Sequence, residues 1–210
     1  MKIVISDIKK EALAVLRGNW SKVAWCSLVY IVLDLVVKNT LSSIISGNEQ
    51  EGSFFVSILF FPLTYGFIKY FLEFEDNQEN EISTIFWAYK KLLAKSILLS
   101  IIIIVRVILW AILLIVPGVM AAISYSLAPF ILVENPDIGF MEAISLSKKL
   151  TRGYKSDIFI FHLSFIGWYI LGFITLGIGL IWVLPYHYTS QVKLYQMLLE
   201  KTDIGLIGNN

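Results

Sequence analysis

Hydrophobic residues occur in six long runs, which short polar or glycine-containing segments separate. A helix that crosses a lipid bilayer needs about 20 mostly apolar residues, with a range of about 17–25. We therefore expect an all-α, polytopic membrane protein with about six transmembrane helices. The expected spans are 22–40, 53–72, 96–116, 118–133, 158–174 and 178–198.

Very short, uncharged breaks join two pairs of these runs. Pro117-Gly118 separates the third run from the fourth, and residues 175–179 separate the fifth from the sixth. Proline and glycine are the strongest local turn signals. We expect each pair to form a tight helical hairpin, and the whole chain to form three hairpins.

The placement of Lys and Arg indicates the orientation in the membrane. Cytoplasmic loops carry the excess of these residues. If both termini lie inside, six spans leave all of the 17 basic residues on the cytoplasmic side except Lys38, which is outside, and Arg106, which is within a helix. We therefore expect a multi-pass protein of the plasma membrane with cytoplasmic N- and C-termini.

A short segment with one apolar and one basic face precedes each hairpin. In helical projection, the apolar residues of 8–17, 82–95 and 140–152 gather on one side, opposite lysine and arginine. Such amphipathic helices suit the membrane plane, next to anionic headgroups. The alternative is that they pack on one another or extend the spans. The basic residues expected to face headgroups are Lys91, Lys95, Lys148, Lys149 and Arg152.

The order of these elements suggests three repeats within one integral membrane domain, 1–210. Glu11-Ala12 precedes Arg17-Gly18, and Glu142-Ala143 precedes Arg152-Gly153, so the first and third copies have short sequence motifs in common. Repeats that run in the same direction would be related by an axis along the membrane normal. The proposed copies are 7–72, 82–133 and 138–198, and their returning helices contain Pro62, Pro129 and Pro185.

Composition supports a lipid environment. Hydrophobic residues make up 57% of the chain and charged residues 16%, whereas soluble domains have about 45–50% and about 25%. The net charge of +1 gives no reason to expect a nucleic-acid partner. The single cysteine, Cys26, excludes an intrachain disulfide and a multi-cysteine metal site.

Polar residues within the expected spans are the best candidates for function, because charged groups are costly at bilayer depth. Asp34 and Arg106 stand out among the charged residues of the expected spans, and we expect them to approach each other or share a hydrated cavity. The alternative for Asp34 is an ion pair with Lys38, and the alternative for both is a structural pin between helices. The remaining intramembrane polar candidates are Tyr125, His162 and His187.

No motif for catalysis stands out. The sequence has no His-Glu-x-x-His, nucleophile elbow, phosphate loop or dinucleotide fingerprint. Two histidines without a neighbouring carboxylate or cysteine cluster are poor support for a metal. We therefore expect a non-enzyme without a cofactor or metal.

Several strings in this order resemble a known family, the Gram-positive polytopic membrane proteins grouped as domain of unknown function nine-seven-five. The resemblance implies a bacterial cell-membrane protein and no particular activity. Other members have a small or amide residue at the position of His187, so no role is carried over to it. The strings are 12–20, Pro117-Gly118, Tyr125-Ser126, Ala128-Pro129, Asn135-Pro136-Asp137, Glu142-Ala143-Ile144, Ser147, 163–168, Thr175, Gly177-Ile178-Gly179, Pro185-Tyr186 and Tyr195.

Two functional interpretations remain open. In the first, the protein is a non-catalytic accessory, scaffold or self-protection factor that binds lipid, a membrane protein partner or further copies of itself. In the second, it is a small transporter or channel subunit with a path near Asp34 and Arg106. Flux that is lost when Arg106 is replaced would favour the second interpretation.

Overall fold

The computed structural model contains only helices and connecting turns in the part of the chain that it describes, which confirms the all-α prediction. That part comprises residues 3–46, 49–77 and 80–202, with the side chains of all of these except 38–57 and 76–77. The elements are α1 (Ile5–Leu16), α2 (Trp20–Ser46), α3 (Glu49–Asn77), the 3-10 helix η1 (Ile82–Phe86), α4 (Trp87–Lys91), α5 (Leu93–Leu113), α6 (Ile115–Tyr125), α7 (Ala128–Glu134), α8 (Phe140–Thr151), α9 (Lys155–Ile174) and α10 (Leu180–Thr202).

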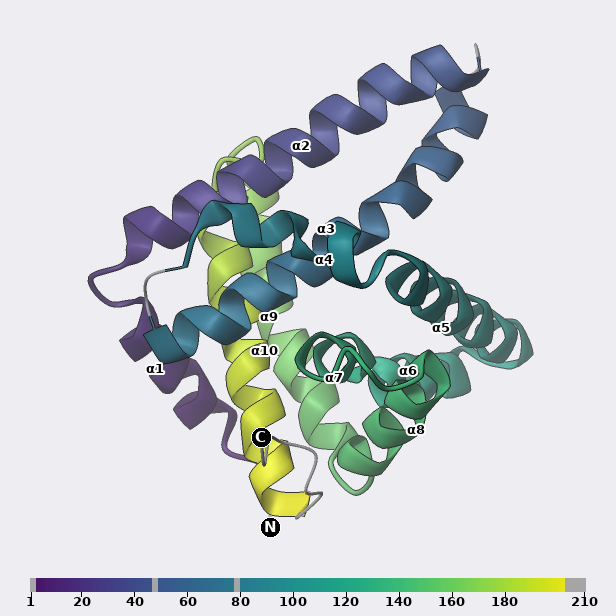
Figure 1. Ribbon diagram of the computed structural model, residues 1–210. Coiled ribbons are helices and arrows are strands. Elements are labelled where there is room, and N and C mark those ends of the chain that lie inside the picture. Colours follow the sequence, from purple (N-terminus) through teal and green to yellow (C-terminus); the bar gives the residue numbers. More distant parts are fainter. Residues whose placement is uncertain (1–2, 47–48, 78–79, 203–210) are drawn as a thin grey trace.

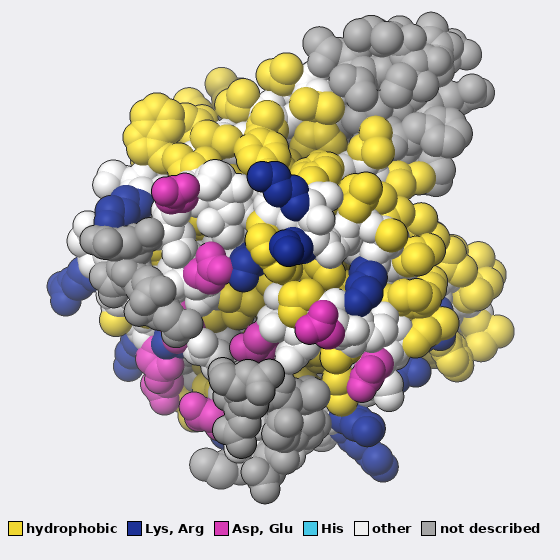
Figure 2. All heavy atoms as spheres, in the orientation of Figure 1, with side chains coloured by type: hydrophobic (Ala, Val, Ile, Leu, Met, Phe, Trp, Pro, Cys, Tyr) yellow, Lys and Arg dark blue, Asp and Glu magenta, His cyan; other side chains and the backbone are white. Residues whose placement is uncertain are grey.

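Four described segments are long and apolar enough to cross a bilayer. Only 11% of the residues in Leu93–Leu113 are buried inside the protein, so the other side chains need an apolar solvent. On the face shown in Figure 2, hydrophobic side chains cover α2 and α5, whereas most charged side chains gather over the lower half. The chain is therefore a membrane protein. The four segments are Trp20–Val37, Leu93–Leu113, Ile115–Glu134 and Lys155–Ile174.

The other two expected spans belong to α3 and α10, which form the centre of the molecule. Helix α3 packs against α2, α5, α7 and α10, and α10 also packs against α1 and α9 (Figure 1). A helix surrounded by other helices can carry polar side chains that would be costly against lipid. This explains why α10 is less apolar than the other expected spans. The expected span 53–72 begins in the part of α3 whose side chains lie outside the described residues.

The break between α5 and α6 lies at Leu114, three residues before the predicted turn at Pro117-Gly118. Leu114 is extended, with φ −160° and ψ 142°. Pro117 belongs to the first turn of α6, where a proline is tolerated because N–H groups in that turn have no hydrogen-bond acceptor within the helix. Gly118 lets α5 and α6 approach closely, since a Cβ at this position would lie 2.7 Å from Ala111 Cβ.

The hairpin of α9 and α10 turns at residues 175–179, as predicted. Thr175 organises this turn with both hydrogen-bonding functions of its hydroxyl group. Its Oγ1 donates to Gly172 O at 2.8 Å and accepts from Gly179 N at 2.8 Å. Gly177 adopts a positive φ of 87°, a conformation that favours glycine.

The expected amphipathic helix over 82–95 consists of two short pieces and the start of α5. Residues 82–86 form a 3-10 helix, and α4 ends at Lys91. Leu92 lies between α4 and α5 and has non-helical backbone angles. A 3-10 helix has about 3.0 residues per turn and therefore shifts the faces of an α-helical projection. The buried residues are Ile85, Ala88 and Leu92, whereas Ile82 and Phe86 are exposed.

The segments 8–17 and 140–152, expected as amphipathic helices, correspond to α1 and α8, and other helices of the protein cover their apolar residues. Ile8, Ala12 and Leu16 of α1 are fully buried, and α1 packs against α10. Ala143 and Leu150 of α8 are fully buried in the same way, and α8 packs against α6 and α7. This burial corresponds to the alternative in which these faces pack on protein.

The first and third expected repeats share the geometry of one connection. Arg17, with φ −62° and ψ 122°, and Gly18, with φ 85°, follow α1. Arg152, with φ −66° and ψ 124°, and Gly153, with φ 88°, follow α8. These angles define a type II turn, which favours glycine at its third position. The corresponding break in the second copy, at Leu92, has no glycine, and superposition of all three copies stays a prediction.

Candidate functional site

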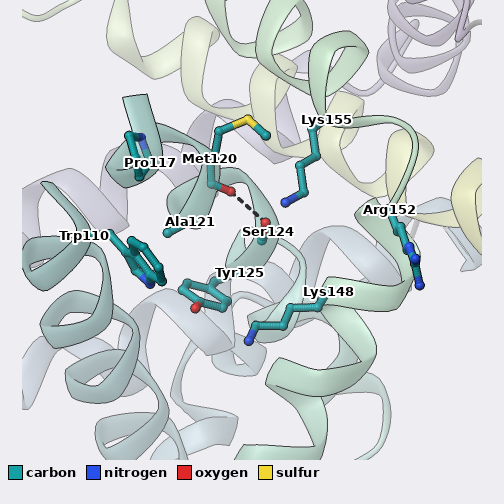
Figure 3. A pocket seen from close by; sticks show the side chains of 9 residues that line it. All are labelled: Trp110, Pro117, Met120, Ala121, Ser124, Tyr125, Lys148, Arg152 and Lys155. Carbon is teal, nitrogen blue, oxygen red and sulfur yellow. Dashed lines mark hydrogen bonds between the residues drawn. The ribbon is translucent and has the colours of Figure 1, made fainter. Parts of the chain in front are cut away.

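A pocket of about 460 Å³ lies between α5, α6, α8 and the start of α9 (Figure 3). We call it the basic pocket, because three cationic side chains line one side. The opposite side is mostly apolar. Its lining residues are Trp110, Pro117, Met120, Ala121, Ser124, Tyr125, Lys148, Arg152 and Lys155.

The packing of α8 explains why its cations face this pocket. The buried apolar face of α8 holds the helix on the protein, and Lys148, which is exposed, lines the pocket beside α6. Ser147 Oγ donates to Ser124 O at 2.8 Å and joins α8 to α6. The type II turn at Arg152 and Gly153 then reverses the chain and brings Lys155 to the same pocket.

The cations are not neutralised by nearby acids. Lys148 Nζ lies 5.4 Å from the centre of the Tyr125 ring, a cation–π arrangement. Lys148 and Lys155 extend toward Tyr125 and Ser124, while Arg152 lies at the rim (Figure 3). In the described part of the chain, the recorded ion pairs join Lys69 to Glu73 and Lys193 to Glu75, so no carboxylate is paired with the three pocket cations.

This arrangement suits an anion that carries an apolar group. Lys and Arg are good donors to phosphate and carboxylate oxygens. Trp110, Pro117 and Met120 offer an apolar wall on the other side of the pocket. Asp157, an acid close to Lys155 in sequence, accepts a hydrogen bond from Ile3 N at 3.1 Å.

Asp34 and Arg106 are not brought together. Arg106 Nη2 donates to Met141 Sδ at 3.6 Å, which links α5 to α8. Asp34 lies on α2, which packs mainly against α3 and α10. The side chain of Lys38, the alternative partner of Asp34, lies outside the described residues.

His162 and His187 are neighbours, a contact that their distance in sequence did not reveal. Their ring centres are 5.7 Å apart. His187 Nδ1 is also 2.6 Å from the Tyr169 hydroxyl group, and His187 Nε2 has no hydrogen-bond partner among the described residues. No group of three His, Cys, Asp or Glu side chains that could hold a metal ion occurs in the described part.

Lys9 packs beside this histidine pair, although it belongs to the amphipathic helix α1. Its Nζ donates to Ser164 O at 3.2 Å and lies 4.3 Å from the centre of the Phe165 ring. Burial lowers the pKa of Lys9 from its ordinary value. Lys9 therefore joins α1 to α9 and is not simply part of a solvated basic face.

The five expected headgroup-facing residues have different environments. Lys148 and Arg152 line the basic pocket, and Lys91 and Lys149 are exposed. Lys95 Nζ donates to Pro136 O at 2.5 Å and Asp137 O at 3.3 Å, so it stabilises a loop of the protein itself.

Reasoning from sequence named three of the nine pocket residues as site candidates: Tyr125, Lys148 and Arg152. Among the residues that it missed are Trp110, Ser124 and Lys155. No helical spacing identifies Lys155, because α8 ends at Thr151 and the turn at Arg152 and Gly153 separates it from α9. Trp110 and Ser124 had no sequence signal either, because only the packing of α5, α6 and α8 brings them together.

Comparison with known proteins places this pocket inside a family segment. The sequence model of the family described as "Protein of unknown function (DUF975)" matches residues 96–202, just over half of the chain. Every residue that lines the basic pocket lies within this segment. Comparisons with curated proteins and with solved structures found no match. The chain therefore belongs to the DUF975 family, which confirms the family inferred from its motifs.

Proposed function

We propose that this chain is a non-catalytic accessory protein of the cell membrane that binds an anionic lipid headgroup in the basic pocket. The observation that carries the proposal is the approach of Lys148 and Lys155, with Arg152 at the rim and without a paired acid in the described part, to a cavity with an apolar wall. An anionic lipid matches both sides of this cavity. The protein would then act as a scaffold or self-protection factor through the lipid, a membrane protein partner or further copies of itself.

We propose six membrane crossings, with both termini in the cytoplasm. The antiparallel packing of α2 on α3, α5 on α6 and α9 on α10 supports this arrangement, as does the placement of Lys and Arg. The pocket cations would then lie near the cytoplasmic leaflet, which is rich in anionic lipids. Ile115, at the tip of the hairpin of α5 and α6, lines a cavity together with Lys155 at the start of α9. The proposed crossing by this hairpin therefore rests on the length and apolarity of its helices and not on its packing against α9.

Cysteine labelling tests this topology. In a Cys26→Ala background, we expect Leu176→Cys to react with a membrane-impermeant maleimide added outside intact cells. We expect Lys10→Cys and Lys149→Cys to react only after the cells are made permeable. Labelling of Lys149→Cys from outside would contradict the proposed orientation. Ile115→Cys then measures the depth that the tip of the hairpin of α5 and α6 reaches.

Loss of pocket charge should reduce the preference for anionic lipid. Each Lys near a membrane surface contributes about 1 kcal/mol toward binding anionic lipid, which is about fivefold in affinity. We expect the double variant Lys148→Gln/Lys155→Gln to bind phosphatidylglycerol about thirtyfold more weakly in detergent, measured by native mass spectrometry.

The matched control is Lys149→Gln, which removes an exposed charge on the same helix outside the pocket. It should retain nearly all of the binding. Equal losses in Lys149→Gln and the double variant would indicate a diffuse surface attraction and would contradict a site in the pocket.

The transporter alternative gains no support from the separation of Asp34 and Arg106.

A further inference from the structure

A second cavity adjoins the basic pocket. It has a volume of about 350 Å³ and runs between α6 and α9, and we call it the apolar groove. Met120 and Lys155 line both cavities, and they lie at the same end of the basic pocket in Figure 3. The other residues of the groove are Ile115, Val116, Val119, Ile123, Ser156, Phe159 and Ile160.

The groove is apolar except at one end. Lys155 is its one charged lining residue, and it marks the junction with the basic pocket. Several wall residues are strongly exposed in the protein alone, such as Ile115 at 78% and Ile160 at 51%. Such side chains require a hydrocarbon neighbour when the protein is in a membrane.

The shape of the groove favours a thin occupant. Helices α6 and α9 pack against each other beside it. A further helix needs an interaxial distance of about 8–10 Å from each neighbour, so an acyl chain suits this crevice better than a partner helix does.

We infer that the two cavities together hold one anionic phospholipid, with its phosphate near Lys148, Arg152 and Lys155 and one acyl chain in the apolar groove. This inference rests on the proposed function and specifies its ligand. The charge of the pocket selects the headgroup, because a zwitterionic headgroup would place its own cation beside these side chains. Because Met120 and Lys155 line both cavities, one molecule with a headgroup in the basic pocket and a chain in the apolar groove accounts for both.

The test compares ligands that share a headgroup but differ in chain length. Purified protein in detergent is titrated with dioleoyl phosphatidylglycerol, dihexanoyl phosphatidylglycerol, dioleoyl phosphatidylcholine and inorganic phosphate, and bound species are counted by native mass spectrometry. We expect the long-chain anionic lipid to bind most tightly. Millimolar inorganic phosphate should fail to displace it, and complete displacement would show a free-anion site and overturn the inference.

Variants that fill the groove provide the decisive comparison. Val119→Trp on α6 and Ser156→Phe on α9 should each weaken binding of the dioleoyl lipid about fivefold and leave binding of the dihexanoyl lipid unchanged. Val105→Trp is the matched control, because it adds the same bulk to an exposed position of α5 outside both cavities. The Ser156→Phe variant decides the question if Val119→Trp does not fold.

The outcomes separate the two proposals. If the wild type does not prefer the anionic long-chain lipid to the phosphatidylcholine, the proposed function fails, and this inference fails with it. A second outcome is that the wild type has that preference and Lys148→Gln/Lys155→Gln loses it. If Val119→Trp and Ser156→Phe then bind the lipid as well as the control Val105→Trp does, the site binds headgroups only. The proposed function then stands, and the inference about the groove is wrong.

Discussion

Replacement of Lys193 by methionine is expected to lower the free energy of unfolding by about 3 kcal/mol, because it leaves a largely buried carboxylate without its partner. Lys193 of α10 forms an ion pair with Glu75 Oε1 near the end of α3. The two side chains are only 19% and 10% exposed. Glu75 Oε2 has no hydrogen-bond partner among the described residues, so the lysine is the main compensation for this charge.

The stability of this variant can be measured with the single cysteine of the chain. Cys26 is fully buried in the native protein, so a thiol-reactive dye labels it in detergent only when the structure opens. Lys193→Met should be labelled at a clearly lower temperature than the wild type.

Two further variants show whether the effect comes from the unpaired charge. Glu75→Leu combined with Lys193→Met should recover most of the stability, since replacing both partners of a buried pair by apolar residues is often neutral. Glu73→Gln breaks the more exposed pair with Lys69, whose side chains are 21% and 38% exposed, and should cost only about 0.5 kcal/mol. If Lys193→Met melts like Glu73→Gln, the ion pair is not important for stability.

Replacement of Gly66 by alanine is expected to destabilise the protein by about 2–3 kcal/mol, because it forces two backbones apart. Gly66 lies in α3 where the 3-10 helix η1 crosses it. A Cβ at this position would lie 1.7 Å from Ile85 O and 2.4 Å from Ile85 C. These are backbone atoms, so no change of a side-chain rotamer can relieve the contact.

The same dye assay measures this loss, and Gly167→Ala is the matched control. Gly167 lies in α9, and a Cβ there would have no heavy atom within 4 Å. Alanine has the higher helix propensity, by about 1 kcal/mol, so this control should be neutral or slightly stabilised. A Gly66→Ala variant as stable as the control would contradict the close packing of α3 on η1.

The predictions that succeeded concern local features of the chain. Residues 175–179 form a turn because glycine adopts the positive φ that the turn needs, whatever surrounds it. The turn predicted at Pro117-Gly118 was displaced to Leu114, because the first turn of a helix accepts proline and the approach of α5 to α6 accepts glycine. The same residue types thus mark either a turn or a packed helix, and only the neighbouring helix distinguishes the two.

The candidate site shows the same division. Reasoning from sequence identified Tyr125, Lys148 and Arg152 for separate reasons, and packing of α8 on α6 brought them into one pocket. It also expected Arg106 to approach Asp34 or share a hydrated cavity with it, whereas the structure places Met141 beside Arg106. Charge alone cannot identify a partner across helices, because the choice depends on which helix faces meet.

By itself, the sequence determined that this protein is helical, that it needs lipid as a solvent, and to which family it belongs. These properties follow from the length and apolarity of the runs and from local motifs, because the cost of placing a side chain in lipid or in water is a property of that side chain. Tertiary structure alone decided that α3 and α10 form the centre, that His162 meets His187, and that three cations line a pocket beside an apolar groove. These contacts join residues far apart in the chain, and they depend on the packing of helix surfaces, which no local pattern encodes.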